Sequence, residues 1–195
     1  MDFRKQFAKP TGTFGWLVGH LMAWKNRERS EYVFSLMELQ PKDRVLEIGF
    51  GSGSDIRRAS REVAFVAGVD HSDVMVRQAS KKNAEMIGEG RVELHLGSAE
   101  RLPYPDAHFD KVYAINVGQF WKDPVATLTE IARVVKPGGV TVVAIQPRQK
   151  GATEDSVHAV GRSMAGALQK AGFSEVRTDS RPMRPVSTVC ALALR

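Results

Sequence analysis

Cysteine is nearly absent from this chain of 195 residues, which contains only Cys190. One thiol cannot form an internal disulfide or a thiolate metal cluster, and this excludes a disulfide-rich scaffold. The His-Glu-x-x-His pattern of many zinc enzymes is also missing. We therefore expect a protein of a reducing compartment with no metal in its site.

Long apolar runs are missing as well. The longest apolar stretch near the N-terminus, Phe14 to Trp24, is interrupted by His20. It spans about half of the ~20 residues that a transmembrane helix needs. No apolar segment of the kind found in signal peptides follows the basic residues of MDFRKQFAKP. These features predict a cytoplasmic protein.

Positive charge exceeds negative charge without forming a run of Lys and Arg. The formal net charge is +6, and residues 1–42 and 147–195 carry the excess. A modest field of this kind is typical of a solvated surface, and an anionic membrane surface is an alternative partner. Nucleic acid is not expected as a partner, because the 49 residues at 147–195 leave no room for an added RNA-binding module. The oligomeric state is left open.

Short apolar segments with strand character alternate with segments of helical periodicity. Strands are expected at 44–48, 64–70, 92–96, 109–115 and 140–145, and helices at 55–62, 72–86, 123–135 and 157–171. This alternation predicts an α/β, Rossmann-like, mainly parallel sheet with helices on both faces. Two last strands, near 173–178 and 186–194, have no room for a crossover and must form an antiparallel hairpin. The expected sheet has seven strands.

The whole chain, 1–195, is expected to form a single domain with three parts. Residues 1–42 form an N-terminal helical cap, 43–146 the cofactor-binding core, and 147–195 a C-terminal helix and hairpin. The cap contains apolar residues at helical spacing from Phe14 to Trp24 and a second helix from about Glu28 to Leu39, before Pro41. We expect this cap to close the crevice of the core.

A glycine-rich loop, Gly49-Phe50-Gly51-Ser52-Gly53, follows the first expected strand. Glycine allows a sharp turn and a close approach to a ligand at the carboxyl ends of the strands. Asp70 ends the second expected strand, where a carboxylate can accept hydrogen bonds from both hydroxyls of a ribose. The third glycine comes one position too early for the dinucleotide fingerprint, which disfavours NAD.

Four segments between residues 44 and 145 resemble class I S-adenosylmethionine-dependent methyltransferases. They are VLEIGFGSGSD, VAGVDHSDVMVRQA, GSAERLPYPDAHFDKVYAIN and LTEIARVVKPGG. The chain is most similar to the subgroup of ubiquinone and menaquinone C-methyltransferases and small-molecule methyltransferases. This resemblance implies an enzyme that binds S-adenosylmethionine and transfers its methyl group to a small-molecule acceptor by in-line displacement.

The resemblance also implies which residues bind the cofactor. The three glycines would lie against its methionine part with Glu47 beneath the loop, Asp70 would bind the ribose, and residues on three further segments would complete the site. The full set is Glu47, Gly49, Gly51, Gly53, Asp70, His71, Met75, Ser98, Ala99, Glu100, Asn116 and Val117.

The catalytic group is not identified by the sequence. Gln119-Phe120 stands where many relatives carry a His pair, and neither side chain abstracts a proton. His20 is a candidate for catalysis, and Trp16, His20 and Trp121 are candidates to face the substrate. Ser98 replaces an Asp that is common in the subgroup, which reduces the charge beside the adenine.

Two other functions stay open. The first is methylation of a lipid headgroup or quinone precursor at a membrane surface. The second is a catalytically degenerate domain that only binds S-adenosylmethionine. DNA base methylation is disfavoured, because the sequence after the fourth expected strand lacks the proline pair and aromatic residue of the amino-methyltransferases.

Overall fold

The computed structural model describes residues 27–195. The chain divides into two compact units, Met1–Tyr32 and Val33–Arg195. The backbone is helical at 27–37, in agreement with the expected second helix. Trp16, His20 and the apolar stretch Phe14 to Trp24 lie outside the described residues.

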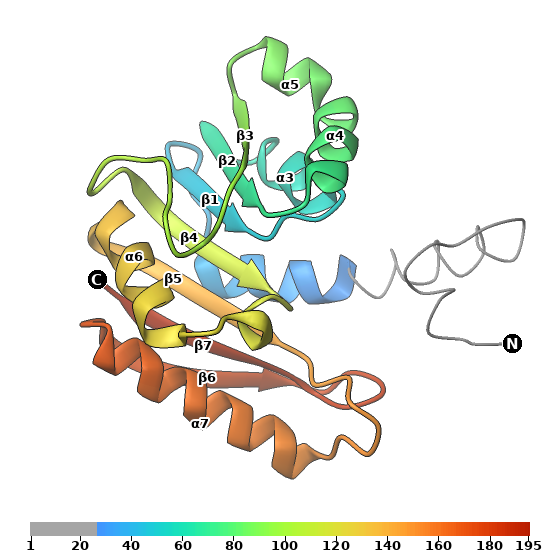
Figure 1. The fold of residues 1–195 in the computed structure, drawn as a ribbon, viewed down its shortest axis with the longest axis vertical. Helices are drawn as coiled ribbons and strands as arrows, with labels where there is room; N and C mark the ends of the chain where they lie inside the picture. The colour runs from blue at the N-terminus through green and yellow to red at the C-terminus, as the bar shows by residue number, and fades with distance from the viewer. Residues whose placement is uncertain (1–26) are drawn as a thin grey trace, which may run out of the picture. The chain divides into compact units, whose positions relative to one another are not determined.

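Seven strands form one sheet in the order β3-β2-β1-β4-β5-β7-β6 (Figure 1). Strands β1 to β5 are parallel, whereas β7 is antiparallel to both β5 and β6. This confirms the α/β fold, the mainly parallel sheet and the C-terminal hairpin. The strands are β1 (Arg44–Ile48), β2 (Phe65–Asp70), β3 (Val92–Leu96), β4 (Phe109–Ile115), β5 (Val135–Ile145), β6 (Ser174–Arg181) and β7 (Thr188–Leu194).

Five helices and one short 3-10 turn connect the strands of the second unit. Two helix starts have the expected caps: the Ser72 hydroxyl accepts the Met75 amide, and the Asp123 carboxylate accepts the Ala126 amide ahead of a helix that begins with proline. The elements are α3 (Ser54–Ala59), α4 (Asp73–Lys82), α5 (Ala84–Gly88), η1 (Gly118–Phe120), α6 (Pro124–Val134) and α7 (Glu154–Lys170).

Side chains of the central strands alternate between two apolar layers, as the pleat requires. On β4, Val112 and Ala114 join a core cluster that contains Leu128 of α6 and Leu168 of α7. Tyr113, between them, points to the other face and is fully buried. Both faces of β4 are therefore covered, which explains why its sequence is continuously apolar from Val112 to Ile115.

The helical segment at 33–37 belongs to the core of the second unit. Phe34 packs edge-on against Tyr113 with ring centroids 5.4 Å apart, and Val33 and Met37 are buried. The Lys111 ammonium donates a hydrogen bond to the Met37 carbonyl oxygen. The division into a cap at 1–42 and a core at 43–146 stays a proposal, with the core beginning earlier than residue 43.

Several element boundaries differ from the expectation, and three of the differences have a local structural reason. The single helix expected at 72–86 is divided into α4 and α5, because Asn83 leaves helical geometry and its side chain bonds elsewhere. Helix α6 ends at Val134, and β5 begins at once with Val135, so Pro137-Gly138-Gly139 lies within a strand. Helix α7 begins three residues early, at Glu154, behind a capping box made by Thr153 and Ser156.

Within residues 27–195, no helix is both long and apolar enough to cross a membrane.

We predict that Phe34→Ala lowers the free energy of unfolding by about 3 kcal/mol, because it leaves a cavity beside Tyr113. Urea unfolding at equilibrium measures the change. Phe120→Ala is the matched control, because Phe120 is 77% exposed and its removal leaves no cavity. Equal stability of the two variants would contradict the assignment of residues 33–37 to the core.

Candidate active site

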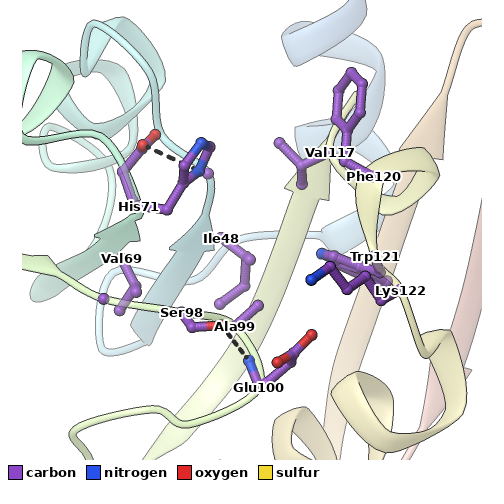
Figure 2. Close-up of a pocket in the computed structure, with 13 residues that line it drawn as sticks. Ile48, Val69, His71, Ser98, Ala99, Glu100, Val117, Phe120, Trp121 and Lys122 are labelled. Carbon is purple, nitrogen blue, oxygen red and sulfur yellow. Dashed lines mark hydrogen bonds and ion pairs between the residues drawn. The ribbon is translucent and has the colours of Figure 1, made fainter.

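The candidate site lies where the strand order reverses. Strand β1 has β2 and β3 on one side and β4 and β5 on the other, and all five point in the same direction (Figure 1). Connections leave β1 and β4 in opposite directions, which opens a crevice beyond the carboxyl ends of these strands. A pocket is present there, lined by Ile48, Gly49, Val69, Asp70, His71, Gly97, Ser98, Ala99, Glu100, Val117, Phe120, Trp121 and Lys122 (Figure 2).

Eight of the residues chosen from the sequence line this pocket. They come from four separate segments: Gly49 after β1, Asp70 and His71 at the end of β2, Ser98 to Glu100 after β3, and Val117 with Trp121 after β4. Glu47, Gly51, Gly53, Met75 and Asn116 are not among the lining residues.

Asp70 holds the glycine loop against the start of α4. Its carboxylate is buried and accepts the Gly51 amide at 2.8 Å and the Ser72 amide at 2.9 Å. A carboxylate has about four acceptor positions, so roughly two remain for a ligand. The structure thus gives Asp70 a bond to the loop in addition to the ribose contact that the sequence implies.

The C-terminal end of α4 holds the same loop from its other side. The buried Asn83 amide donates to the Gly53 carbonyl at 3.1 Å and to the Ala79 carbonyl at 2.8 Å. The Lys82 ammonium donates to the hydroxyls of Ser52 and Ser54, and partial burial lowers its pKa. The sequence did not identify these two contacts, because side chains thirty residues from the loop meet it only in the folded protein.

The three glycine positions of the loop require a residue without a side chain for different structural reasons. A Cβ on Gly49 would lie 2.3 Å from the Val117 side chain, and one on Gly53 would lie 2.6 Å from the Ala79 Cβ. A Cβ on Gly51 would meet no atom within 4 Å, although its φ of +54° favours glycine. Packing explains Gly49 and Gly53, whereas Gly51 faces open space.

Glu47 is buried beneath the loop and does not line the pocket. Its carboxylate accepts a hydrogen bond of 2.9 Å from the Tyr113 hydroxyl. Burial raises the pKa of Glu47 well above its usual value, and the negative charge of Asp55 raises it further, whereas the bond from Tyr113 opposes the rise. Glu47 therefore supports the loop from a buried position, where its carboxyl group is harder to ionise than in water.

Asn116 shapes the wall that follows β4. It adopts a left-handed conformation with φ of +56°, and its side-chain oxygen accepts the Gln146 amide at 2.8 Å. Asparagine tolerates this conformation better than most residues. The resulting turn leads into Val117 and η1, which carry the lining residues Phe120, Trp121 and Lys122.

Five lining residues were not selected from the sequence: Ile48, Val69, Gly97, Phe120 and Lys122. Ile48 ends the first expected strand and Val69 is the second-last residue of the second. Each directly precedes a selected residue, Gly49 or Asp70, so strand position was a usable signal for them. Phe120 and Lys122 flank Trp121 in the chain, but no periodicity shows which way an irregular turn directs its side chains.

Comparison with known proteins places the chain in a family. Residues 46–143, about half of the chain, match the family model described as a methyltransferase domain. The chain belongs to this family. It is an S-adenosylmethionine-dependent methyltransferase.

Individual relatives agree with this assignment. An uncharacterized methyltransferase of Bacillus subtilis, YdaC, is 28% identical over 91% of this chain and 97% of its own length. The phosphatidylethanolamine N-methyltransferase of Cereibacter sphaeroides is 38% identical, but the match covers only 55% of this chain and 53% of that protein. The crystal structure of a methyltransferase from Aquifex aeolicus shares the fold with a TM-score of 0.67 at 23% identity, over 85% of this chain and 88% of that one.

The residues present fit the cofactor that the family uses. Asp70 retains acceptor capacity toward the pocket, Gly51 leaves its Cβ position open, and Ile48, Val69, Ala99 and Val117 supply apolar walls. Such a combination suits a nucleoside whose ribose needs acceptors and whose base needs apolar contact.

Substitution of two glycines should separate packing from binding in this methyltransferase. Gly53→Val should unfold or strongly destabilise the chain, because Ala79 and the Asn83 amide occupy the space. Gly51→Val should cost only about 1–2 kcal/mol of stability from backbone strain but weaken S-adenosylhomocysteine binding roughly ten-fold or more by filling the space above the loop. Urea unfolding and isothermal titration calorimetry measure the two effects. Normal binding by a folded Gly51→Val variant would remove the loop from the cofactor site.

The raised pKa of Glu47 predicts a pH-dependent stability. A carboxyl group whose pKa is higher in the folded protein than its unfolded value of 4.5 loses favourable free energy as the pH rises between the two values. Glu47→Gln keeps an oxygen for the Tyr113 hydroxyl and cannot ionise. Its stability relative to the wild type should therefore increase from about pH 5 to about pH 8.

Thermal unfolding at both pH values measures this difference, with Glu62→Gln at an exposed site as the control. A difference between Glu47→Gln and the wild type that stays constant with pH would show that Glu47 titrates as in the unfolded chain.

Proposed function

We propose that this methyltransferase acts on a small-molecule acceptor bound in the pocket beyond the carboxyl ends of β1, β2 and β4. The observation that carries the proposal is the pocket itself, which is bounded on two sides by segments from four strands. A concave site of this kind holds a small molecule in a fixed orientation, whereas a flat surface does not.

The residues of the chain contribute binding and orientation. S-adenosylmethionine, when bound, supplies a methyl group attached to a sulfonium sulfur. This sulfur is the leaving group and becomes a neutral thioether. Asp70 would orient the ribose, the Gly49 to Gly53 loop would support the methionine part, and Ser98, Ala99 and Glu100 would follow the adenine edge. His71 and Met75 would flank the adenine. Asn116 would position Val117 near the methionine end.

No group among the described lining residues is assigned to proton removal from the acceptor, because His71 and Glu100 would lie along the adenine. His20 lies outside the described residues and stays a candidate. A substrate whose nucleophile is already deprotonated would need no base.

A small-molecule acceptor and a lipid-headgroup acceptor predict different results. A lipid-headgroup methyltransferase would require vesicles for turnover, and the partial match to a phosphatidylethanolamine N-methyltransferase makes that experiment worthwhile. Labelled S-adenosylmethionine with a small-molecule cell extract, with and without anionic vesicles, distinguishes the proposals. Transfer without vesicles supports a small-molecule acceptor, and transfer only into vesicle lipid contradicts it.

Deletion of residues 1–26 tests the part of the proposal that concerns Trp16 and His20. We predict that the shortened chain, beginning at Arg27, keeps its fold and binds S-adenosylhomocysteine but transfers methyl groups at least ten-fold more slowly, because acceptor contacts are lost. The cut precedes Phe34 and Met37, so the core stays complete. Circular dichroism, calorimetry and the labelled transfer assay measure fold, binding and rate. Full activity would remove Trp16 and His20 from the acceptor site.

A further inference from the structure

The pocket has two facing walls of different chemistry (Figure 2). The first contains His71 and Ser98 beside Asp70, at the end of β2 and after β3. The second comes from the single segment after β4 and contains Phe120, Trp121 and Lys122. This inference rests on the proposed function: if the nucleoside lies along the first wall, the second wall is left for the acceptor.

The second wall combines aromatic surface with one basic side chain. Phe120 is 77% exposed at the rim, and Trp121 is partly buried against the core cluster. Aromatic side chains of this kind bind planar or apolar ligands by stacking and edge contacts. Lys122 supplies the only ammonium or guanidinium group among the described residues that line the pocket.

Lys122 has no ion pair or hydrogen bond with another side chain of residues 27–195, unlike Lys82, Lys111 and Lys136. The carboxylate of Glu100 faces the side of the pocket that holds Trp121 and Lys122 (Figure 2). Attraction between exposed opposite charges is worth roughly 1 kcal/mol or less. A ligand anion that makes a direct charge-assisted hydrogen bond therefore competes well for the Lys122 ammonium.

We propose that Lys122 selects an acceptor that carries an anionic group, a carboxylate or a phosphate, on a planar apolar body that packs against Phe120 and Trp121. The ammonium binds the anion, and the aromatic side chains hold the body. Lys122 acts here as a specificity residue, since an ammonium supplies no methyl-accepting or proton-abstracting step while it is protonated.

The experiment uses the full chain, labelled S-adenosylmethionine and a dilute small-molecule extract of the expression host. Labelled products are separated by anion exchange, and phosphatase treatment of the retained fraction distinguishes phosphate from carboxylate. We expect the label in the retained fraction. Lys122→Ala should slow its formation roughly ten-fold or more, the loss expected for a hydrogen bond to a charged group. Lys122→Arg should restore most of the rate, because it keeps the charge.

Lys170→Ala is the matched control, because it removes the same charge from the far end of α7. The affinity of Lys122→Ala for S-adenosylhomocysteine, measured by calorimetry, should stay within about two-fold of the wild type. A loss of that affinity would assign Lys122 to the cofactor and overturn the inference. Label in neutral or cationic products, or an unchanged rate in Lys122→Ala, would also overturn it. Absence of label from every fraction, with cofactor binding intact, would instead reject the proposed function on which the inference rests.

Discussion

The carboxylate of Asp70 fixes the relative positions of two of the segments that surround the candidate site. It joins the amide of Gly51, in the loop after β1, to the amide of Ser72, ahead of α4. Because the carboxylate is buried, both bonds are protected from competing water. The loop, the end of β2 and the start of α4 therefore form one preorganised unit, and the same group retains acceptor capacity toward the pocket.

The glycine loop depends on this unit and on contacts from further segments of the chain. Asn83 and Lys82 hold it from α4, and Val117 lies so close that Gly49 has no space for a side chain. Beneath it, Glu47 is paired with Tyr113, whose ring packs on Phe34. A chain of contacts thus connects the loop to the helical segment at 33–37. This arrangement keeps the backbone of the methyltransferase in a shape that a ligand would otherwise have to impose at a cost in entropy.

The alternation of short apolar segments with segments of helical periodicity was sufficient to predict the strands and most helices. Parallel strands covered on both faces need continuous apolar runs, and this makes them recognisable in the sequence. This alternation failed at Asn83, where a side-chain bond to the glycine loop ends a helix that the local pattern would continue. It also failed at Pro137-Gly138-Gly139, which the sequence marks as a turn but which lies within β5. In both places a long-range contact outweighs local preference. The position of β7 between β5 and β6 likewise follows from sheet pairing, which no local pattern contains.

The sequence by itself determined the α/β class, the antiparallel hairpin, the glycine loop with its acidic partner Asp70, and the family, because each depends on residue types at short and fixed spacing. The tertiary structure alone decided which glycine faces open space, that Glu47 is buried against Tyr113, and that Lys122 lines the same pocket as Asp70. These features join residues tens of positions apart. Their neighbours are set by the order of strands in the sheet and by irregular turns, whose side-chain directions have no period.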